Sequence, residues 1–414
     1  MPPASPPMQF SQIELPNGLH ILGEVNPRAH SVALGYFVRT GSRDETPEVA
    51  GVSHFLEHMA FKGDERYSAA DVNRVFDELG ANYNASTSEE TTLYYAAVLP
   101  ESIEPTLDLL STLIRPSLRQ ADFDVEKQVI IEEIGMYDDQ PSYAVYEQAM
   151  QAYFAGHPLS HSVLGTAESI TALRSEQMRD YHARHYGTEN LTLVAAGNFD
   201  FDQLVKLAEQ RCGGWARGGA TRQLLAPQPP RAVRWFEKDS IHQEHVIAMA
   251  PAPEATSRLR FAAEMVSVIV GEEGSGRLYW ELVESGRAET ADLGYSEFEG
   301  HGSWMTYLCC EPDDVDANLE LLGRVLDKVM AEGLTEAELE QARNKVASRT
   351  VLRSERPMGR LSTLGNDWIY RHEYRTVAED IALLRGVTLK DIRELLDAFP
   401  LRTVTQVGLG PKKG

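Results

Sequence analysis

Residues 54–58, with the sequence His-Phe-Leu-Glu-His, constrain this chain most, because their polar side chains share one face only if the stretch is helical. A helix turns by about 100° per residue, so His54, Glu57 and His58 lie on one side of it. Two neutral imidazoles in this arrangement can bind one zinc ion, and the carboxylate can reach a water at the open position of the metal. The alternative is an ordinary helix with two histidines on its polar face, since five residues can match by chance.

A catalytic zinc site needs a third protein ligand, and the best candidate lies in residues 122–134. The pattern there predicts a helix with an acidic first turn and an inward stripe of Phe123, Ile130, Ile134 and Tyr137. Glu126 and Glu133 fall within this stripe, whereas Glu132 points away. Since a buried carboxylate must be paired, protonated or bound to a metal, we predict Glu133 as the third ligand and Glu126 as a group that orients a histidine. The alternative is another helix register, with both glutamates in solvent.

The inverted order H-x-x-E-H is the inverzincin signature. Together with other segments it resembles the pitrilysin and mitochondrial-processing-peptidase family of zinc proteases, in particular short bacterial members similar to the processing-peptidase β subunit. The resemblance covers nearly the whole chain and runs through residues 15–19, 41–45, 54–63, 84–87, 126–133 and 195–198.

This resemblance implies a function and a set of site residues. In the family, the two histidines and the second glutamate of an E-x6-E pair bind zinc, and the glutamate inside H-x-x-E-H is the general base. By this likeness one zinc ion per chain is held by His54, His58 and Glu133, with Glu57 as the base and Glu126 as the supporting glutamate. The implied activity is that of a zinc-dependent endopeptidase acting on extended or unfolded peptides. The alternative is a non-catalytic core-type subunit or the peptide-binding partner of a heterodimeric processing peptidase.

Small residues at 82–88 precede a strand predicted at 92–99, and they leave a sheet edge that can pair with an extended peptide. The family uses this segment for its substrate. We therefore expect Asn84, Ala85 and Ser86 to bind the peptide backbone, although a plain sheet edge would have the same composition.

In active relatives the second half of the chain supplies an arginine and, seven residues later, a tyrosine that hold the substrate carbonyl. Counted from Arg277, the arginine would fall at Val283. The nearest substitutes, Arg287 and Tyr295, are eight residues apart. Either the pair has shifted to these residues, or a partner chain supplies it. The family's chamber is built from four half-units and this chain has two, so we expect a homodimer or a heterodimer with a paralogous chain.

The order of the predicted elements divides the chain into two similar halves. We expect an α+β protein with two homologous αβ domains, each a mixed or antiparallel sheet covered by helices, as in the duplicated pitrilysin-like fold. The expected boundaries are a zinc-binding domain at 1–217, a polar, proline-rich linker at 218–230 and a metal-free domain at 231–414. Residues 274–281, where the second half would repeat the H-x-x-E-H helix, contain no histidine.

Composition excludes several other classes of protein. A net charge of −23 argues against nucleic-acid binding, which needs a basic patch. The sequence has no run of about 18 apolar residues to span a membrane, and residues 1–7 lack the basic and apolar regions of a signal peptide. Cys212, Cys309 and Cys310 are too few for a disulfide framework. We therefore expect a cytoplasmic protein.

Overall fold

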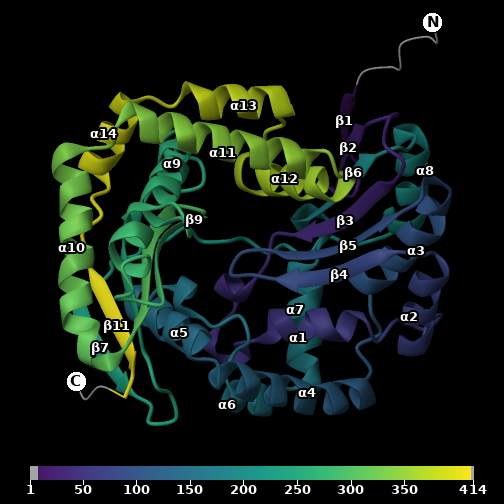
Figure 1. Cartoon of the computed structure of the whole chain (residues 1–414). Helices are drawn as coiled ribbons and strands as arrows, with labels where there is room; N and C mark the ends of the chain where they lie inside the picture. Colours follow the sequence, from purple (N-terminus) through teal and green to yellow (C-terminus); the bar gives the residue numbers. More distant parts are fainter. Residues whose placement is uncertain (1–7, 412–414) are drawn as a thin grey trace, which may run out of the picture. The chain divides into compact units, whose positions relative to one another are not determined.

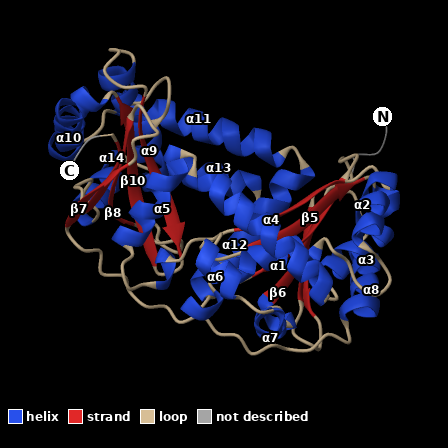
Figure 2. Ribbon diagram, turned by 90° about the horizontal axis from the view of Figure 1, so that it is seen from below, coloured by secondary structure: helices blue, strands red, loops and turns tan. Residues whose placement is uncertain are grey.

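The computed structural model describes residues 8–411, so residues 1–7, for which the sequence predicts no signal peptide, lie outside the described part. The chain forms two compact units, each with one sheet and its own covering helices (Figures 1 and 2). Within the described residues, the first unit comprises 8–134, 161–223 and 352–374, and the second comprises 135–160, 224–351 and 375–411.

The sheet of the first unit has six strands in the order β1-β2-β6-β3-β5-β4. In that order their bounds are Gln9–Glu14, His20–Val25, Leu191–Gly197, Val32–Val38, Thr92–Val98 and Asn82–Thr87. Strands β2 and β6 are parallel, and the other neighbours are antiparallel. β4 ends the sheet and, among the described strands, pairs with β5 alone, so its other edge is free.

Helices cover both faces of this sheet. Seven of them are α1 (Val52–Ala60), α2 (Ala69–Glu78), α3 (Ile103–Ile114), α4 (Gln120–Asp138), α6 (Ala167–Ala172), α7 (Ser175–His185) and α8 (Phe201–Cys212). On one face the Tyr36 hydroxyl lies 3.0 Å from Ser111 Oγ of α3. On the other face, α12 (Pro357–Arg371) packs its Gly365 against the ring of Phe37. A Cβ at Gly365 would lie 2.1 Å from that ring, so only glycine allows this approach.

The sheet of the second unit has five strands in the order β7-β11-β8-β10-β9. In that order their bounds are Ala232–Glu237, Thr405–Gly410, Glu244–Ala252, His301–Cys310 and Thr290–Phe298. Strands β7 and β11 are parallel and the remaining neighbours are antiparallel. The series β2-β6-β3-β5-β4 has the same pattern. The predicted duplication of an αβ fold is therefore confirmed.

Helices also cover both faces of the second sheet. Their bounds are α5 (Pro141–Tyr153), α9 (Arg260–Gly271), α10 (Val315–Glu332), α11 (Glu336–Ser354), α13 (Val377–Gly386) and α14 (Leu389–Ala398). Helix α5 contributes Met150 and Tyr153 to an apolar cluster with Ile247 and Val407 of the sheet. Helices α9, α10 and α14 form a second cluster around Trp304, which lies on the opposite face of β10 from Tyr307.

The two units depart from the expected contiguous boundaries. Helix α5 precedes residue 217 but packs on β8 and β11, and α12 follows residue 231 but packs on β3 and β6. Each crosses over because its apolar face fits the sheet of the other half. The start of the expected linker also belongs to the first unit, since buried Arg222 donates to Asp44 Oδ2 and to the Glu90 carbonyl, both over 2.6 Å.

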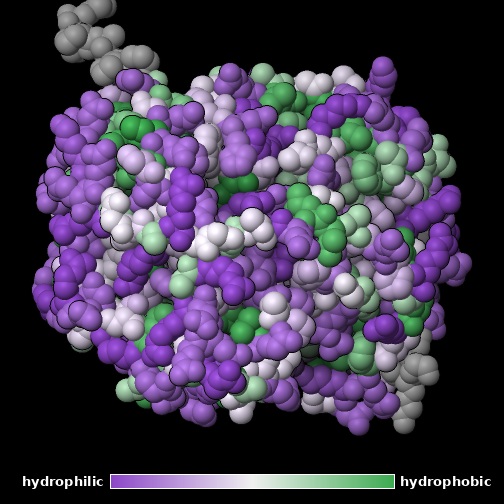
Figure 3. Space-filling view, turned by 180° about the vertical axis from the view of Figure 1, so that it is seen from behind, coloured by the Kyte–Doolittle hydropathy of each residue, from purple (hydrophilic) through white to green (hydrophobic). Residues whose placement is uncertain are grey.

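Hydrophilic residues cover most of the face seen in Figure 3, and hydrophobic residues form small separate patches between them. Of the helices within residues 8–411, none combines the length and the apolar composition needed to cross a membrane.

Candidate metal centre and active site

Helix α1 carries the histidine motif, and its apolar side fixes its orientation. Val52, Phe55, Leu56 and Met59 recur at helical spacing and are buried. This packing leaves the side of His54, Glu57 and His58 facing α4 and the end of β4.

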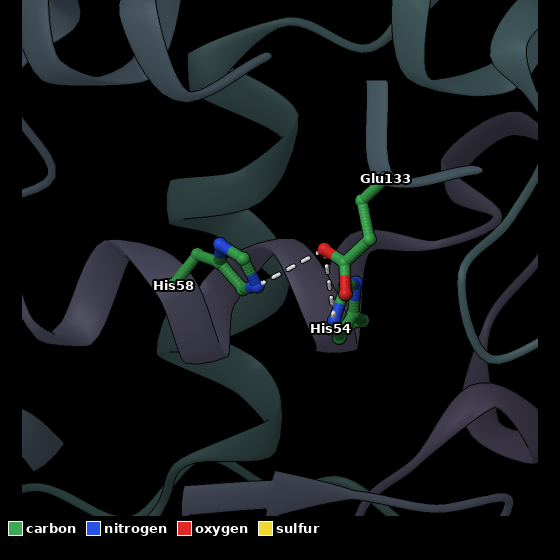
Figure 4. A group of neighbouring side chains, drawn as sticks. All are labelled: His54, His58 and Glu133. Carbon is green, nitrogen blue, oxygen red and sulfur yellow. Dashed lines mark ion pairs between the residues drawn. The ribbon is translucent and has the colours of Figure 1, made fainter. Parts of the chain in front are cut away.

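His54, His58 and Glu133 come together as the sequence predicts (Figure 4). Glu133 Oε2 lies 3.4 Å from His58 Nε2 and 3.8 Å from His54 Nε2. Ligands about 2.1 Å from a tetrahedral zinc ion are about 3.4 Å apart, so this spacing suits zinc. Glu126 is buried and Glu132 is exposed, which agrees with the predicted register of α4.

The unsatisfied polar atoms of the cluster also fit a cation. Glu133 Oε2 is buried and has no hydrogen-bond partner among the described residues. A buried carboxylate oxygen without a donor is costly, and a metal ion between it and the two imidazole nitrogens would remove that cost. Burial, together with the neighbouring His58, lowers the pKa of His54 to about 3, so this imidazole is neutral, as a metal ligand must be.

Glu126 holds His58 as predicted for a supporting glutamate. Its Oε1 accepts a hydrogen bond from His58 Nδ1 over 2.9 Å, which leaves Nε2 directed at Glu133. The other oxygen of Glu126 pairs with the ammonium of Lys62. Burial acts to raise the pKa of Glu126, but His58 and Lys62 outweigh it and lower that pKa. Sequence reasoning did not assign Lys62, although it lies only four residues beyond His58.

Glu57 lies beside the three candidate ligands and is held by Thr87 at the end of β4. The Thr87 hydroxyl donates to Glu57 Oε2 over 2.6 Å. Burial raises the pKa of Glu57 above its ordinary value, and the bond from Thr87 acts in the opposite direction. The carboxylate thus lies next to the candidate metal position. Thr87 is a second residue that sequence reasoning did not assign, because only the tertiary structure brings it to Glu57.

Comparison with known proteins identifies the family. The family model described as Insulinase (Peptidase family M16) matches residues 20–167, and the one described as Peptidase M16 inactive domain matches residues 172–346. An uncharacterized zinc protease of Mycobacterium bovis is 31% identical over 407 residues, which cover 96% of this chain and 92% of that protein. The chain belongs to peptidase family M16.

Solved structures show the same M16 fold. A protease from Helicobacter pylori has a TM-score of 0.90 at 20% identity, covering 98% of this chain and 100% of its own. A chain in complex III2 from Candida albicans has a TM-score of 0.84 at 18% identity, covering 97% and 96%. Because one match is called a protease and the other belongs to complex III2, the M16 fold alone does not separate a peptidase from a core-type subunit.

The predicted peptide-binding residues of this M16 chain lie on the edge strand β4. Asn84 and Ser86 are exposed and Ala85 is buried. The Ala85 amide donates to Asn84 Oδ1 over 2.9 Å. The Asn84 side chain therefore accepts from an amide that could otherwise donate to a bound peptide strand. Their role in binding peptides stays a prediction.

Arg287 and Tyr295 lie in the second unit. Arg287 is exposed and precedes β9, and its carbonyl accepts from Asn318 Nδ2 over 2.8 Å. Tyr295 is in β9, and its hydroxyl donates to the Pro253 carbonyl over 2.7 Å. Whether either residue binds a substrate carbonyl stays a prediction.

The second unit carries no counterpart of the histidine motif, but the position expected for it needs correction. Strand order makes β8 the equivalent of β3, so the helix that follows β8, α9, corresponds to α1. Residues 274–281 come later, at a short π-helical segment, Tyr279–Val283. Neither stretch contains histidine.

Proposed function

We propose that this M16 protein is a zinc-dependent endopeptidase that hydrolyses extended or unfolded peptides. The main support is the convergence of His54, His58 and Glu133, with Glu57 alongside them at the free edge of β4. The M16 relatives named zinc proteases add to it. In this proposal one zinc ion per chain is held by the two histidines and Glu133.

Bound zinc would polarise the scissile carbonyl and make a water molecule more acidic. Glu57 takes a proton from that water as the hydroxyl adds to the carbonyl carbon. Glu57 then gives the proton to the leaving nitrogen as the carbon–nitrogen bond breaks, so a peptide and one water yield a carboxylic acid and an amine. Glu126 keeps His58 oriented throughout.

Substrate binding in this proposal uses the free edge of β4. An extended peptide adds to the sheet by main-chain hydrogen bonds, near Asn84, Ala85 and Ser86. We also propose that the chain works as a dimer, with a second copy or with a paralogous chain, and that Arg287 and Tyr295 or their counterparts in the partner contact the substrate carbonyl.

The alternative is a non-catalytic core-type subunit or peptide-binding partner. The fold that this chain shares with a chain of complex III2 is compatible with it but equally compatible with a protease. The complete ligand set argues against it, because a structural subunit has no need of two histidines and a glutamate around a buried, unsatisfied oxygen.

The test is hydrolysis of internally quenched, unstructured peptides whose two termini are chemically blocked. We expect cleavage that a chelator abolishes and that one equivalent of zinc restores, and the blocked ends exclude an exopeptidase. The assay is run on the chain alone and with a paralogous M16 chain. Zinc content far below one per chain, or cleavage that a chelator leaves unchanged, would refute the proposal.

A further inference from the structure

Thr87 contacts the carboxylate of Glu57 through its side chain. Its hydroxyl donates to Glu57 Oε2 over 2.6 Å, and its nearby backbone amide also acts to lower the pKa of this carboxyl group. A glutamate side chain has three rotatable bonds, so an unattached carboxylate takes up several orientations. The short bond from the Thr87 hydroxyl restricts these orientations.

The register of β4 explains why Thr87 faces Glu57. Along an antiparallel pair, every second residue turns its N–H toward the partner strand, and the residues between turn theirs away. The Ser88 amide donates to the Thr91 carbonyl over 2.9 Å at the β4–β5 turn, so the amides of Thr87 and Ala85 point to the free edge. Glu57 therefore lies at the end of the edge along which an extended peptide would pair.

The turn after Thr87 is anchored independently of Glu57. The Ser88 carbonyl accepts from the Ser42 amide over 3.2 Å. Arg43, which follows Ser42, donates from Nη1 to the carboxylate of Glu90 over 2.5 Å, and both side chains are buried. These contacts tie the β4–β5 turn to the segment that leads into α1. These contacts fix the position of the turn that follows Thr87, so Thr87 can hold the Glu57 carboxylate in place.

We propose that Thr87 is a positioning residue for peptide hydrolysis, which holds the Glu57 carboxylate where a peptide paired with β4 would meet it. This inference rests on the proposed function. A displacement of about 1 Å at a reacting group can cost about 100-fold in rate. Because Thr87 acts on Glu57 rather than on a metal ligand, its loss should lower kcat and spare zinc binding.

The test compares full-length Thr87→Val, Thr87→Ser and Thr91→Val variants. Thr87→Val keeps the shape of the side chain but lacks the hydroxyl, so kcat should fall about 10-fold or more, with KM within about twofold and zinc content unchanged. Thr87→Ser should recover most of the loss. Thr91→Val is the matched control, since the Thr91 hydroxyl bonds to Ser88 Oγ over 3.1 Å in the same turn, and it should retain the parent kcat.

A crystal structure of Thr87→Val supplies a readout that does not depend on turnover. Glu57 is expected to leave its present position in this variant and to keep it in Thr91→Val. An unmoved Glu57, a Thr87→Val kcat within about twofold of the parent, or equal losses in Thr87→Val and Thr91→Val would overturn the inference. A parent chain that binds zinc but cleaves no peptide would refute the proposed function instead, and the crystallographic comparison would still decide the role of Thr87.

Discussion

The two histidines of α1 are held in different ways. His58 Nδ1 bonds to Glu126, which also pairs with Lys62. His54 Nδ1 is buried and has no hydrogen-bond partner within the described residues. A histidine whose second nitrogen is bonded keeps its ring orientation and tautomer before the metal arrives. We therefore expect His58 to be the preoriented ligand and the position of His54 to depend on packing.

Lys62→Met should weaken zinc binding by roughly 10-fold, because Lys62 helps to keep Glu126 ionised and able to accept from His58. Competition with a chromogenic chelator measures the affinity. Lys127→Met is the control, since the Lys127 ammonium donates to the carbonyls of Thr171 and Leu173 instead. Equal affinities in both variants and the parent would show that Lys62 does not support the metal centre.

Glu133→Gln should lower zinc occupancy, whereas Glu132→Gln should leave it near the parent value. Glu133 Oε2 faces both imidazoles, and Glu132 is exposed on another side of the same helix. Metal analysis of the two purified variants after equal dialysis decides the matter. Similar zinc losses in both would rule out Glu133 as a specific ligand.

The start of α1 depends on contacts with distant parts of the chain. Gly51 has φ 88°, and a Cβ there would lie 2.7 Å from the Leu164 carbonyl. The buried Glu45 carboxylate accepts from the amides of Gly51 and Ser53 over 2.6 and 2.7 Å, and so satisfies two donors at the helix N-terminus. This cap fixes where the metal-binding helix begins.

The contribution of Glu45 to stability should depend on pH. Burial raises its pKa to about 8, although the two amide bonds act to lower it. Between about pH 4.5 and 8 the folded state therefore holds a proton that the unfolded chain has lost, so the stabilisation falls as pH rises. Urea unfolding of the parent and of Glu45→Gln should show a stability difference that declines through this range and is constant above it. A difference that increases with pH would mean that Glu45 is an ionised cap.

Local patterns predict the helices of the site but not the helices that cross over. Helix α4 is evident from its spacing of apolar residues, and the same spacing separates Glu133 from Glu132. Helix α12 contains Gly359 and Gly365, which weaken a local helical signal, and its Gly365 is explained only by contact with Phe37. Strand β11 ends in Gly-Leu-Gly for a similar reason.

In strand β11, Gly408 lies so close to the ring of Trp235 that a Cβ at this position would be 2.0 Å from a ring atom. This glycine, like Gly365, is explained only by a tertiary contact.

Sequence spacing predicts that His54, Glu57 and His58 share one face of a helix. The contact from Thr87 to Glu57 depends instead on how β4 packs against α1. Residues that share one helix were therefore predictable from spacing, and Glu133 and Glu126 from the inward stripe of α4 and the family resemblance. No such pattern pointed to the contact between Thr87 and Glu57.

The duplicated fold has one candidate metal centre for its two units within residues 8–411. The two sheets share a five-strand series, yet among the described residues the group of His54, His58 and Glu133 is the one set of ligands close enough to bind an ion. The family model for the second half is described as the inactive domain. We therefore expect the second unit to contribute to substrate binding or assembly. Arg287 and Tyr295 are its candidate substrate-binding residues.

Arg287→Ala and Tyr295→Phe distinguish a shifted arginine and tyrosine pair from one that a partner supplies. A shifted pair predicts that each change lowers kcat/KM by about 10-fold or more with zinc content unchanged, because contacts to the developing oxyanion are lost. If both variants match the parent and the chain is active alone, the pair has no catalytic role. Activity that requires a paralogous chain would make this protein the metal-bearing subunit of a heterodimer.

Turnover and zinc content of Glu57→Gln, measured on one sample, decide whether Glu57 acts as the general base. Glu57 is not a proposed ligand, so zinc should stay near one per chain while peptide hydrolysis falls by about 10²- to 10⁴-fold, the usual effect of losing a general base. Retention of more than about a tenth of the parent activity with zinc bound would show that Glu57 is not the base.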